Sequence, residues 1–263
     1  MVAPEIELVL APNPSVMTGR GTNTYVFGED SVAVLDPGPN MPEHLEAILT
    51  RVGRRSVAAI VVTHGHSDHL PAAYPLARAT GAPIYGHQRL PGVTRIIRDG
   101  EVLQVNQRGL RAIDTPGHTR DSLSFLVEDE RLLFAGDVVA GEGSVVVGRE
   151  RGDLSLYMQS LQRLLSEPVD TILPGHGPAV PAGINLLQGY IQHRLSRERE
   201  VLEGLAAGAR TVGELVETIY PALDPRLLAA ATGNVQAHLW KLEDEQRTKF
   251  SADGQWHLAE RIG

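Results

Sequence analysis

The 263-residue sequence contains no cysteine, and this absence excludes several kinds of chemistry. Disulfide bonds, thiolate metal ligands and a cysteine nucleophile are all ruled out. Any metal site must therefore use histidine and carboxylate ligands. The chain also lacks a run of about eighteen apolar residues and a basic N-terminal segment leading into a long apolar one. We therefore expect a soluble, cytoplasmic protein that does not span a membrane.

Positive charge is also scarce. The formal net charge is −8 at pH 7 and the sequence pI is about 5.7, so the overall field of the protein does not attract nucleic-acid phosphates. A nucleic-acid role would need a local basic patch. The length allows one large domain, or a medium domain followed by a small one.

Short β-branched segments alternate with helical segments over about the first 180 residues. The segments TYVFG, SVAVLDPG, VAAIVVTH, APIYGH, LRAIDTPGH, LSFLVEDERLLFAGD and DTILPGHG each predict strands of four to seven residues. We expect helices over about 42–53, 71–81 and 154–167, the last of them capped by Asp153, and a hairpin turn at 128–131. Strands interleaved with helices indicate a layered α/β domain.

The pattern changes after residue 183. A long amphipathic helix is predicted over 184–207, followed by further helical segments and two short strands across a turn, which is the order of a winged helix. We expect three parts: a first domain over 1–183, a connecting helix over 184–207 and a winged-helix-like domain over 208–263.

A nucleic-acid-binding module is the non-enzyme alternative for this C-terminal part. Winged helices that read DNA usually present a basic recognition helix. The candidate helix over 234–249 carries Glu243, Asp244 and Glu245, and residues 184–263 hold nine basic against eleven acidic residues. Duplex DNA is therefore not an expected partner, and the domain is expected to pack against a cleft and shape it.

The segment VVTHGHSDHL holds the densest group of candidate ligands, namely His64, His66, Asp68 and His69, immediately after an apolar run. The pattern H-x-H-x-D-H should occur by chance roughly 0.0007 times in a chain of this composition. The alternative is a hydrogen-bonded polar loop, which would have to satisfy four imidazole or carboxylate groups within six residues. A metal site explains the pattern better.

Three further candidate ligands, His118, Asp137 and His176, follow other apolar strands. Strand ends at one edge of a sheet lie close in space, so separate loops can deliver seven ligands to one rim. We assign His64, His66 and His118 to a first metal and Asp68, His69 and His176 to a second, with Asp137 bridging them. The anionic bridge is needed because two divalent cations about 3.5 Å apart repel each other.

The segments THGHSDH, TPGH, AGD and GHG, in this order, resemble the metallo-β-lactamase superfamily. The resemblance covers about residues 5–182 and implies a four-layer αββα sandwich with two metals at one end of the sheets. Asp36 in VLDPG matches a further superfamily position and is expected to orient a ligand. Branches with a cysteine ligand are excluded, and the separation of 39 positions from Asp137 to His176 leaves no room for the inserted domain of the β-CASP branch.

A narrower similarity, to the β-lactamase-like protein 2 group, rests on NPSVMTGRGTNTYVFG, GDVVAGEG, LPGHGPAV and YIQHRLSRERE. That group includes single-strand-specific endoribonucleases, and its relatives include thioesterases of polyketide synthesis. The resemblance implies a hydrolase in which two divalent metal ions activate a bridging hydroxide. The substrate stays open between a phosphodiester such as single-stranded RNA and an ester, thioester or lactam.

Metal identity and the smaller roles are also expectations. Zinc is favoured, because diiron flavoproteins of this fold replace the second histidine of the motif with glutamate whereas His66 is retained here. Asp68 and Asp137 are the candidate catalytic residues, and Asp68 could exchange a proton with the nucleophile. Candidate substrate contacts are Asn23, Tyr25, Glu142, His193 and Arg194, with Arg197 at the same helical spacing. For His44, His87, His238 and His257 we expect packing or surface roles. The sequence leaves the oligomeric state open and allows a homodimer.

Overall fold

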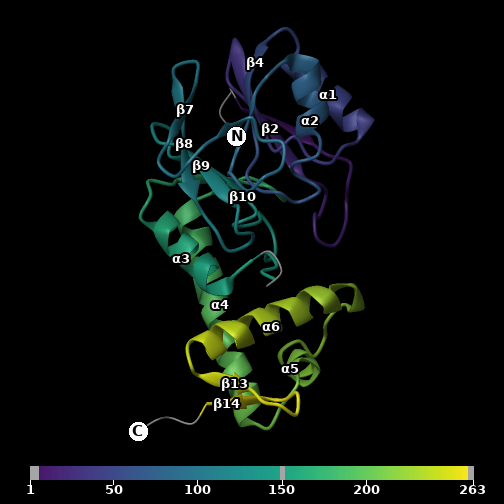
Figure 1. The fold of residues 1–263 in the computed structure, drawn as a ribbon, viewed down its shortest axis with the longest axis vertical. Coiled ribbons are helices and arrows are strands. Elements are labelled where there is room, and N and C mark those ends of the chain that lie inside the picture. The colour runs from purple at the N-terminus through teal and green to yellow at the C-terminus, as the bar shows by residue number, and fades with distance from the viewer. Residues whose placement is uncertain (1–5, 149–151, 260–263) are drawn as a thin grey trace.

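Two six-stranded sheets face each other, with helices on both outer faces (Figure 1). The computed structural model describes residues 6–148 and 152–259. The first sheet runs in the order β1 (Ile6–Leu10), β2 (Asn23–Phe27), β3 (Ser31–Leu35), β4 (Ser56–Val61), β5 (Ile84–Gly86) and β6 (Arg95–Ile96). The second runs in the order β12 (Val180–Pro181), β11 (Thr171–Pro174), β10 (Leu132–Gly136), β9 (Leu123–Val127), β8 (Arg108–Asp114) and β7 (Val102–Val105).

The helices complete the four layers. Helices α1 (Pro42–Val52) and α2 (Ala73–Thr80) cover the first sheet, while α3 (Leu154–Leu165) and α4 (Gly183–Ala206) cover the second. Asp153 caps α3, as expected, by accepting from the backbone N–H groups of Ser155 and Leu156. The αββα sandwich inferred from the resemblance is therefore confirmed.

Each interface between layers has its own apolar core, because the strands alternate or are apolar on both faces. Phe27, Phe125 and Phe134 lie between the two sheets. Ile48 and Leu76 pack between the first sheet and its helices. A third core joins the second sheet to α3 and to the N-terminal part of α4.

The C-terminal part of the chain forms a separate helical unit below the sandwich (Figure 1). It contains α5 (Val212–Ile219), a short 3-10 helix η1 (Pro225–Leu227), α6 (Leu228–Asp244) and the two-stranded sheet β13 (Thr248–Phe250) and β14 (Trp256–Leu258). Three helices and a two-stranded wing are the winged-helix arrangement expected from the sequence.

Helix α4 belongs to both units. Leu187 and Ile191 pack into the core of the sandwich, whereas Val201 and Leu205 pack with α5 and α6. The change of core therefore falls inside a continuous helix, and the domain limits at 183 and 207 stay predictions. Across residues 6–148 and 152–259, no helix is long and apolar enough to cross a bilayer.

Candidate metal centre

The candidate ligands gather where strands of both sheets end at one edge of the sandwich. β8, β10 and β11 run in the same direction, because β8 and β10 are each antiparallel to β9 and β10 is parallel to β11. His118, Asp137 and His176 follow the C-terminal ends of these strands. The segment after β4 joins the same edge through a hydrogen bond from the backbone N–H of Leu123 to the carbonyl of Thr63, 2.8 Å long.

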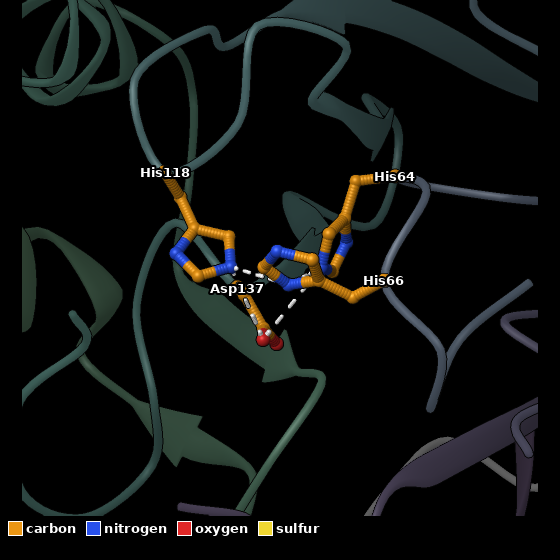
Figure 2. A group of neighbouring side chains, drawn as sticks. All are labelled: His64, His66, His118 and Asp137. Carbon is orange, nitrogen blue, oxygen red and sulfur yellow. Dashed lines mark hydrogen bonds and ion pairs between the residues drawn. The ribbon is translucent and has the colours of Figure 1, made fainter. Parts of the chain in front are cut away.

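The first cluster consists of His64, His66, His118 and Asp137, whose ligand atoms lie within 4.8 Å of one another. His66 Nδ1 is 3.0 Å from Nε2 of both His64 and His118. Asp137 Oδ2 is 3.8 Å from His64 Nε2 and 3.6 Å from His118 Nε2. Figure 2 shows the three rings and the carboxylate pointing toward one another.

The second cluster consists of Asp68, His69 and His176. His176 Nε2 is 3.2 Å from Asp68 Oδ2, and His69 Nε2 is 3.6 Å from the same oxygen. Asp137 lies between the clusters, with its carboxylate oxygens 3.4 Å from Nε2 of both His69 and His176. The seven side chains thus group as the sequence suggests, while their metal ligation stays a prediction.

Hydrogen bonds at the outer ring nitrogens direct the inner nitrogens toward the clusters. His69 Nδ1 donates to Asp36 Oδ2 at 2.9 Å, and His118 Nδ1 donates to the Val146 carbonyl at 2.9 Å. The Thr63 hydroxyl donates to Asp36, so it accepts from His64 Nδ1. When each of these rings is neutral, the proton on Nδ1 leaves Nε2 with a free lone pair, the form that binds metals.

Hydrogen bonds also fix the carboxylates of Asp36 and Asp68. Asp36 has a positive φ of 46° and also accepts from the backbone N–H of Thr63, which locks it beneath His69. Asp68 Oδ2 accepts from the Thr22 hydroxyl at 3.1 Å. The position of Asp36 fits the orienting role expected for it.

Burial and charge set the protonation of the two clusters differently. Burial lowers the pKa of His64 well below its usual value, and burial with the neighbouring His118 lowers the pKa of His66 to about 4. Burial acts the same way on His69, but Asp137 and Asp36 outweigh it and hold the pKa of His69 well above its usual value. Burial is likewise outweighed at His176, whose pKa is raised to about 9 by hydrogen bonds to Asp137 and Asp68.

At the Asp137 carboxylate, burial and the neighbouring charges shift the pKa in the opposite directions. Burial raises the pKa of Asp137, but His69 and His176 outweigh it and lower that pKa well below its usual value. Two buried atoms, His69 Nε2 and Asp137 Oδ1, lie 3.4 Å apart, and neither has a hydrogen-bond partner among residues 6–148 and 152–259. Buried polar atoms are rarely left so, and two that face a cluster of lone pairs fit divalent cations.

Several residues that we expected to contact substrate are buried in the structure. Asn23 is buried and donates to the carbonyls of Pro174 and Gly177, and the buried Tyr25 hydroxyl donates to Pro174 as well. Both side chains are occupied in holding the segment that carries His176. Neither therefore projects toward substrate, which corrects that expectation.

Arg194 is a second correction, because only 2% of it is exposed and its guanidinium is engaged with the Val145 carbonyl and with Asn234. Arg197 pairs with Glu200 and lies over Tyr220. Glu142 is exposed on the loop after Asp137, and His193 is half-buried on α4. Substrate contact by these last two stays a prediction.

Some supporting groups were missed from the sequence. Thr22 and Thr63 adjoin quoted motifs, so their hydroxyls could have been considered. Gly175 is required because a Cβ there would lie 2.3 Å from Asp137 Oδ1. The Val146 carbonyl carries no sequence signal, since its role depends on how the loop is packed.

A four-layer sandwich with histidines and carboxylates gathered at one sheet edge defines a class of metal-dependent hydrolases. The family model described as metallo-β-lactamase superfamily matches residues 17–95 and 89–176. The model described as β-lactamase associated winged helix domain matches residues 211–256. The chain belongs to the metallo-β-lactamase superfamily and is a hydrolase of that superfamily.

Individual proteins show the same relationship over most of the chain. The β-lactamase-like protein 2 homolog of Caenorhabditis elegans is 34% identical over 247 residues, covering 89% of this chain and 82% of the relative. The atrochrysone carboxyl ACP thioesterase of Aspergillus fumigatus is 34% identical over 244 residues, covering 85% and 76%. The crystal structure of a metallo-β-lactamase family protein from Thermus thermophilus matches the fold with a TM-score of 0.83 at 22% identity, covering 98% of this chain and 100% of that one.

Proposed function

We propose that this hydrolase is dinuclear and cleaves an acyl substrate of the thioester or ester class. The observation that carries the dinuclear site is the convergence of seven side chains, two of whose buried atoms, His69 Nε2 and Asp137 Oδ1, have no hydrogen-bond partner in the described part of the chain. The thioesterase named among the relatives supports the acyl class, and so does the net charge of −8, which does not favour a polyanionic substrate.

The carboxylates and the two metal ions would have different roles in hydrolysis. Asp137 supplies negative charge between the two clusters, and its pKa, held low by His69 and His176 against the effect of burial, keeps it ionised at neutral pH. Asp68 is anchored by Thr22, and although burial raises its pKa, the contacts with His176 and His69 outweigh it and lower the pKa to about 2, so Oδ2 is ionised and can accept a proton and pass it on. Two bound divalent cations, one at each cluster, would supply an activated water at neutral pH and polarise the scissile carbonyl.

Zinc is our proposal for the metal. Three imidazoles beside one carboxylate suit zinc, although manganese and iron also accept nitrogen and oxygen ligands. Metal analysis of protein purified without added metal tests this directly. We expect a ratio of two zinc ions per chain, and an iron content of two with little zinc would overturn the assignment.

A phosphodiester such as single-stranded RNA is a second candidate. The observation that favours it is a pair of exposed arginines near the clusters: Arg20 precedes Thr22 by two residues, and Arg120 follows His118 by two. Guanidinium groups bind phosphate oxygens well. The same groups would also bind a carboxylate or phosphate elsewhere in an acyl substrate.

One assay set separates these substrates. Metal-loaded protein is given an acyl thioester, a p-nitrophenyl ester, labelled single-stranded RNA and a chromogenic lactam. We expect thioester hydrolysis to be fastest, and Asp137→Asn to lower it at least about a hundredfold. The matched control is Asp170→Asn, which alters an exposed ion pair with Arg131. Cleavage of RNA alone would replace the acyl class, and full activity in Asp137→Asn would refute the dinuclear site. The cytoplasmic location and the homodimer stay predictions, to be checked by fractionation and sedimentation.

A further inference from the structure

The segment that fixes the orientation of His118 lies far from it in sequence. His118 donates from Nδ1 to the carbonyl of Val146, which belongs to the loop over 138–148 that follows Asp137. The loop directly follows Asp137, a member of the first cluster. Its later part is joined to the same cluster by the hydrogen bond from His118. The remaining contacts of the loop decide how accurately the Val146 carbonyl is placed.

Those contacts come from helices that enter the C-terminal unit. Arg194 on α4 donates from Nη2 to the carbonyl of Val145 at 2.5 Å and from Nη1 to Asn234 Oδ1 at 3.2 Å. Asn234 lies on α6, and its Oδ1 also accepts from the backbone N–H of Val147 at 3.4 Å. The groups on both sides of Val146 are thus held by one arginine and one asparagine.

A second residue of α4 holds the earlier part of the loop. The Tyr190 hydroxyl accepts from the backbone N–H of Ala140 at 2.9 Å and donates to the carbonyl of Gly143 at 3.2 Å. Apolar packing follows the same path, since Val145, Val147 and Tyr190 share a core with Ala237 of α6. The loop is therefore fixed to the C-terminal helices at several points.

The burial of Arg194 indicates that this arginine has a specific structural role. Its guanidinium lies over the Tyr157 ring at 5.2 Å, its Nε has no hydrogen-bond partner, and none of its hydrogen bonds within residues 6–148 and 152–259 goes to a carboxylate. Burying a cation without an anionic partner costs free energy that an apolar side chain would avoid. A role in placing the loop explains why an arginine occupies this position.

We propose that Arg194 and Asn234 are positioning residues for the first metal cluster. They hold the backbone of residues 145–147 so that the Val146 carbonyl keeps the proton of His118 on Nδ1 and aims Nε2 at the cluster. This inference rests on the proposed metal site, and it gives the C-terminal unit a role at that site without contact to substrate.

The test uses the full chain with Arg194→Met and Asn234→Leu, each of which removes the hydrogen bonds and keeps most of the side-chain volume. Asn234→Asp is the conservative variant, because its carboxylate still accepts from Arg194 and Val147. The matched control is Thr248→Val, which removes a buried hydrogen bond to the Leu239 carbonyl within the winged-helix unit, away from the loop.

Three measurements are made on each variant: zinc binding against a competing chelator, nitrogen-15 NMR of the histidine rings in zinc-loaded protein, and thermal unfolding. We expect Arg194→Met and Asn234→Leu to weaken zinc binding at the first cluster about 10- to 100-fold, the range found when partners of ligating histidines are lost. The second cluster should keep its affinity. The His118 Nδ1 proton should exchange faster with water, and Asn234→Asp should restore the wild-type values.

Two results would overturn the inference. One is wild-type zinc affinity at both clusters in Arg194→Met and Asn234→Leu, with only the loss of thermal stability that Thr248→Val also shows. The other is equal weakening at both clusters. If Arg194→Met does not fold, Asn234→Leu together with Tyr190→Phe decides the matter. A wild-type protein that binds no metal refutes the proposed function itself, so the two failures are distinguishable.

Discussion

Gly175→Ala tests most directly whether the two clusters work as one site. Gly175 lies between β11 and His176, and its backbone is fixed on both sides by hydrogen bonds to Gly136 and Asn23. A Cβ added there would lie 2.3 Å from Asp137 Oδ1 and 2.7 Å from His69 Cε1. Gly175 has no positive φ, so the substitution introduces steric overlap without backbone strain.

The size of the effect follows from these distances. Asp137 and the new methyl group must separate by about 0.7 Å to reach even 3.0 Å, the lower limit of real Cβ contacts. Overpacking of this kind costs about 1–3 kcal/mol, or roughly 2–10 °C in Tm for a chain of this size. Because Asp137 and His69 belong to different clusters, we expect both metal affinities to fall about 10- to 100-fold and kcat to fall about a hundredfold.

The assay is a zinc titration against a chelator, with turnover of the best substrate and a thermal melt on the same samples. Gly189→Ala is the matched control, since Gly189 lies on an exposed face of α4 and a Cβ there meets no atom of the described residues within 4 Å. That variant should keep metal binding and gain up to about 1 kcal/mol from helix propensity. Unchanged zinc affinity and turnover in Gly175→Ala would show that Asp137 and His69 do not act together.

Three other changes give separate tests. Asp36→Asn replaces the carboxylate that accepts from His69 Nδ1 with an amide. We expect zinc to bind about 10- to 100-fold more weakly at the second cluster, measured by competition with a chelator. Unchanged zinc binding would contradict the orienting role of Asp36. Removing metal with a chelator should lower Tm, because an ion at 100 times its Kd adds about 2.7 kcal/mol; equal Tm values with and without metal would count against the site. Burial, with Arg194 and Lys241 adding to it, lowers the pKa of His238 to about 3. As pH falls, the His238 ring therefore takes up a proton in the unfolded chain before it does so in the folded one. The free energy of unfolding falls as pH drops below about 6.5, by about 2 kcal/mol at pH 5. His238→Leu should remove that part of the slope in denaturant melts at pH 7 and 5, and equal slopes would refute the assignment.

The residues that the sequence identified are those whose signal is local. His64, His66, Asp68 and His69 follow an apolar strand within six residues, and such a pattern survives any error in the element boundaries. His118, Asp137 and His176 were found because each follows its own strand. The parallel direction of β8, β10 and β11 then brings their loops to one edge.

Residues whose role depends on packing could not be found in this way. Asn23 and Tyr25 stand in a quoted motif, but only the structure shows that their polar atoms bind the carbonyls beside His176. Arg194 shares its helical spacing with Arg197, and on that pattern we expected it to contact substrate. It is buried because α4 passes from one core to another at this point, and a single sequence does not reveal where a helix changes neighbours.

The shared helix makes metal binding and docking of the C-terminal unit interdependent. If Arg194 and Asn234 strengthen zinc binding at the first cluster by placing the Val146 carbonyl, bound zinc must stabilise the contact of α4 and α6 with the loop by the same factor. A 10- to 100-fold effect on affinity equals about 1.4–2.8 kcal/mol, enough to be seen as slower amide exchange at the N-terminal part of α6 on adding zinc. The effect should vanish in Asn234→Leu while exchange in β13 and β14 stays the same. Slower exchange throughout the winged-helix unit in that variant would mean that zinc acts on it by another route.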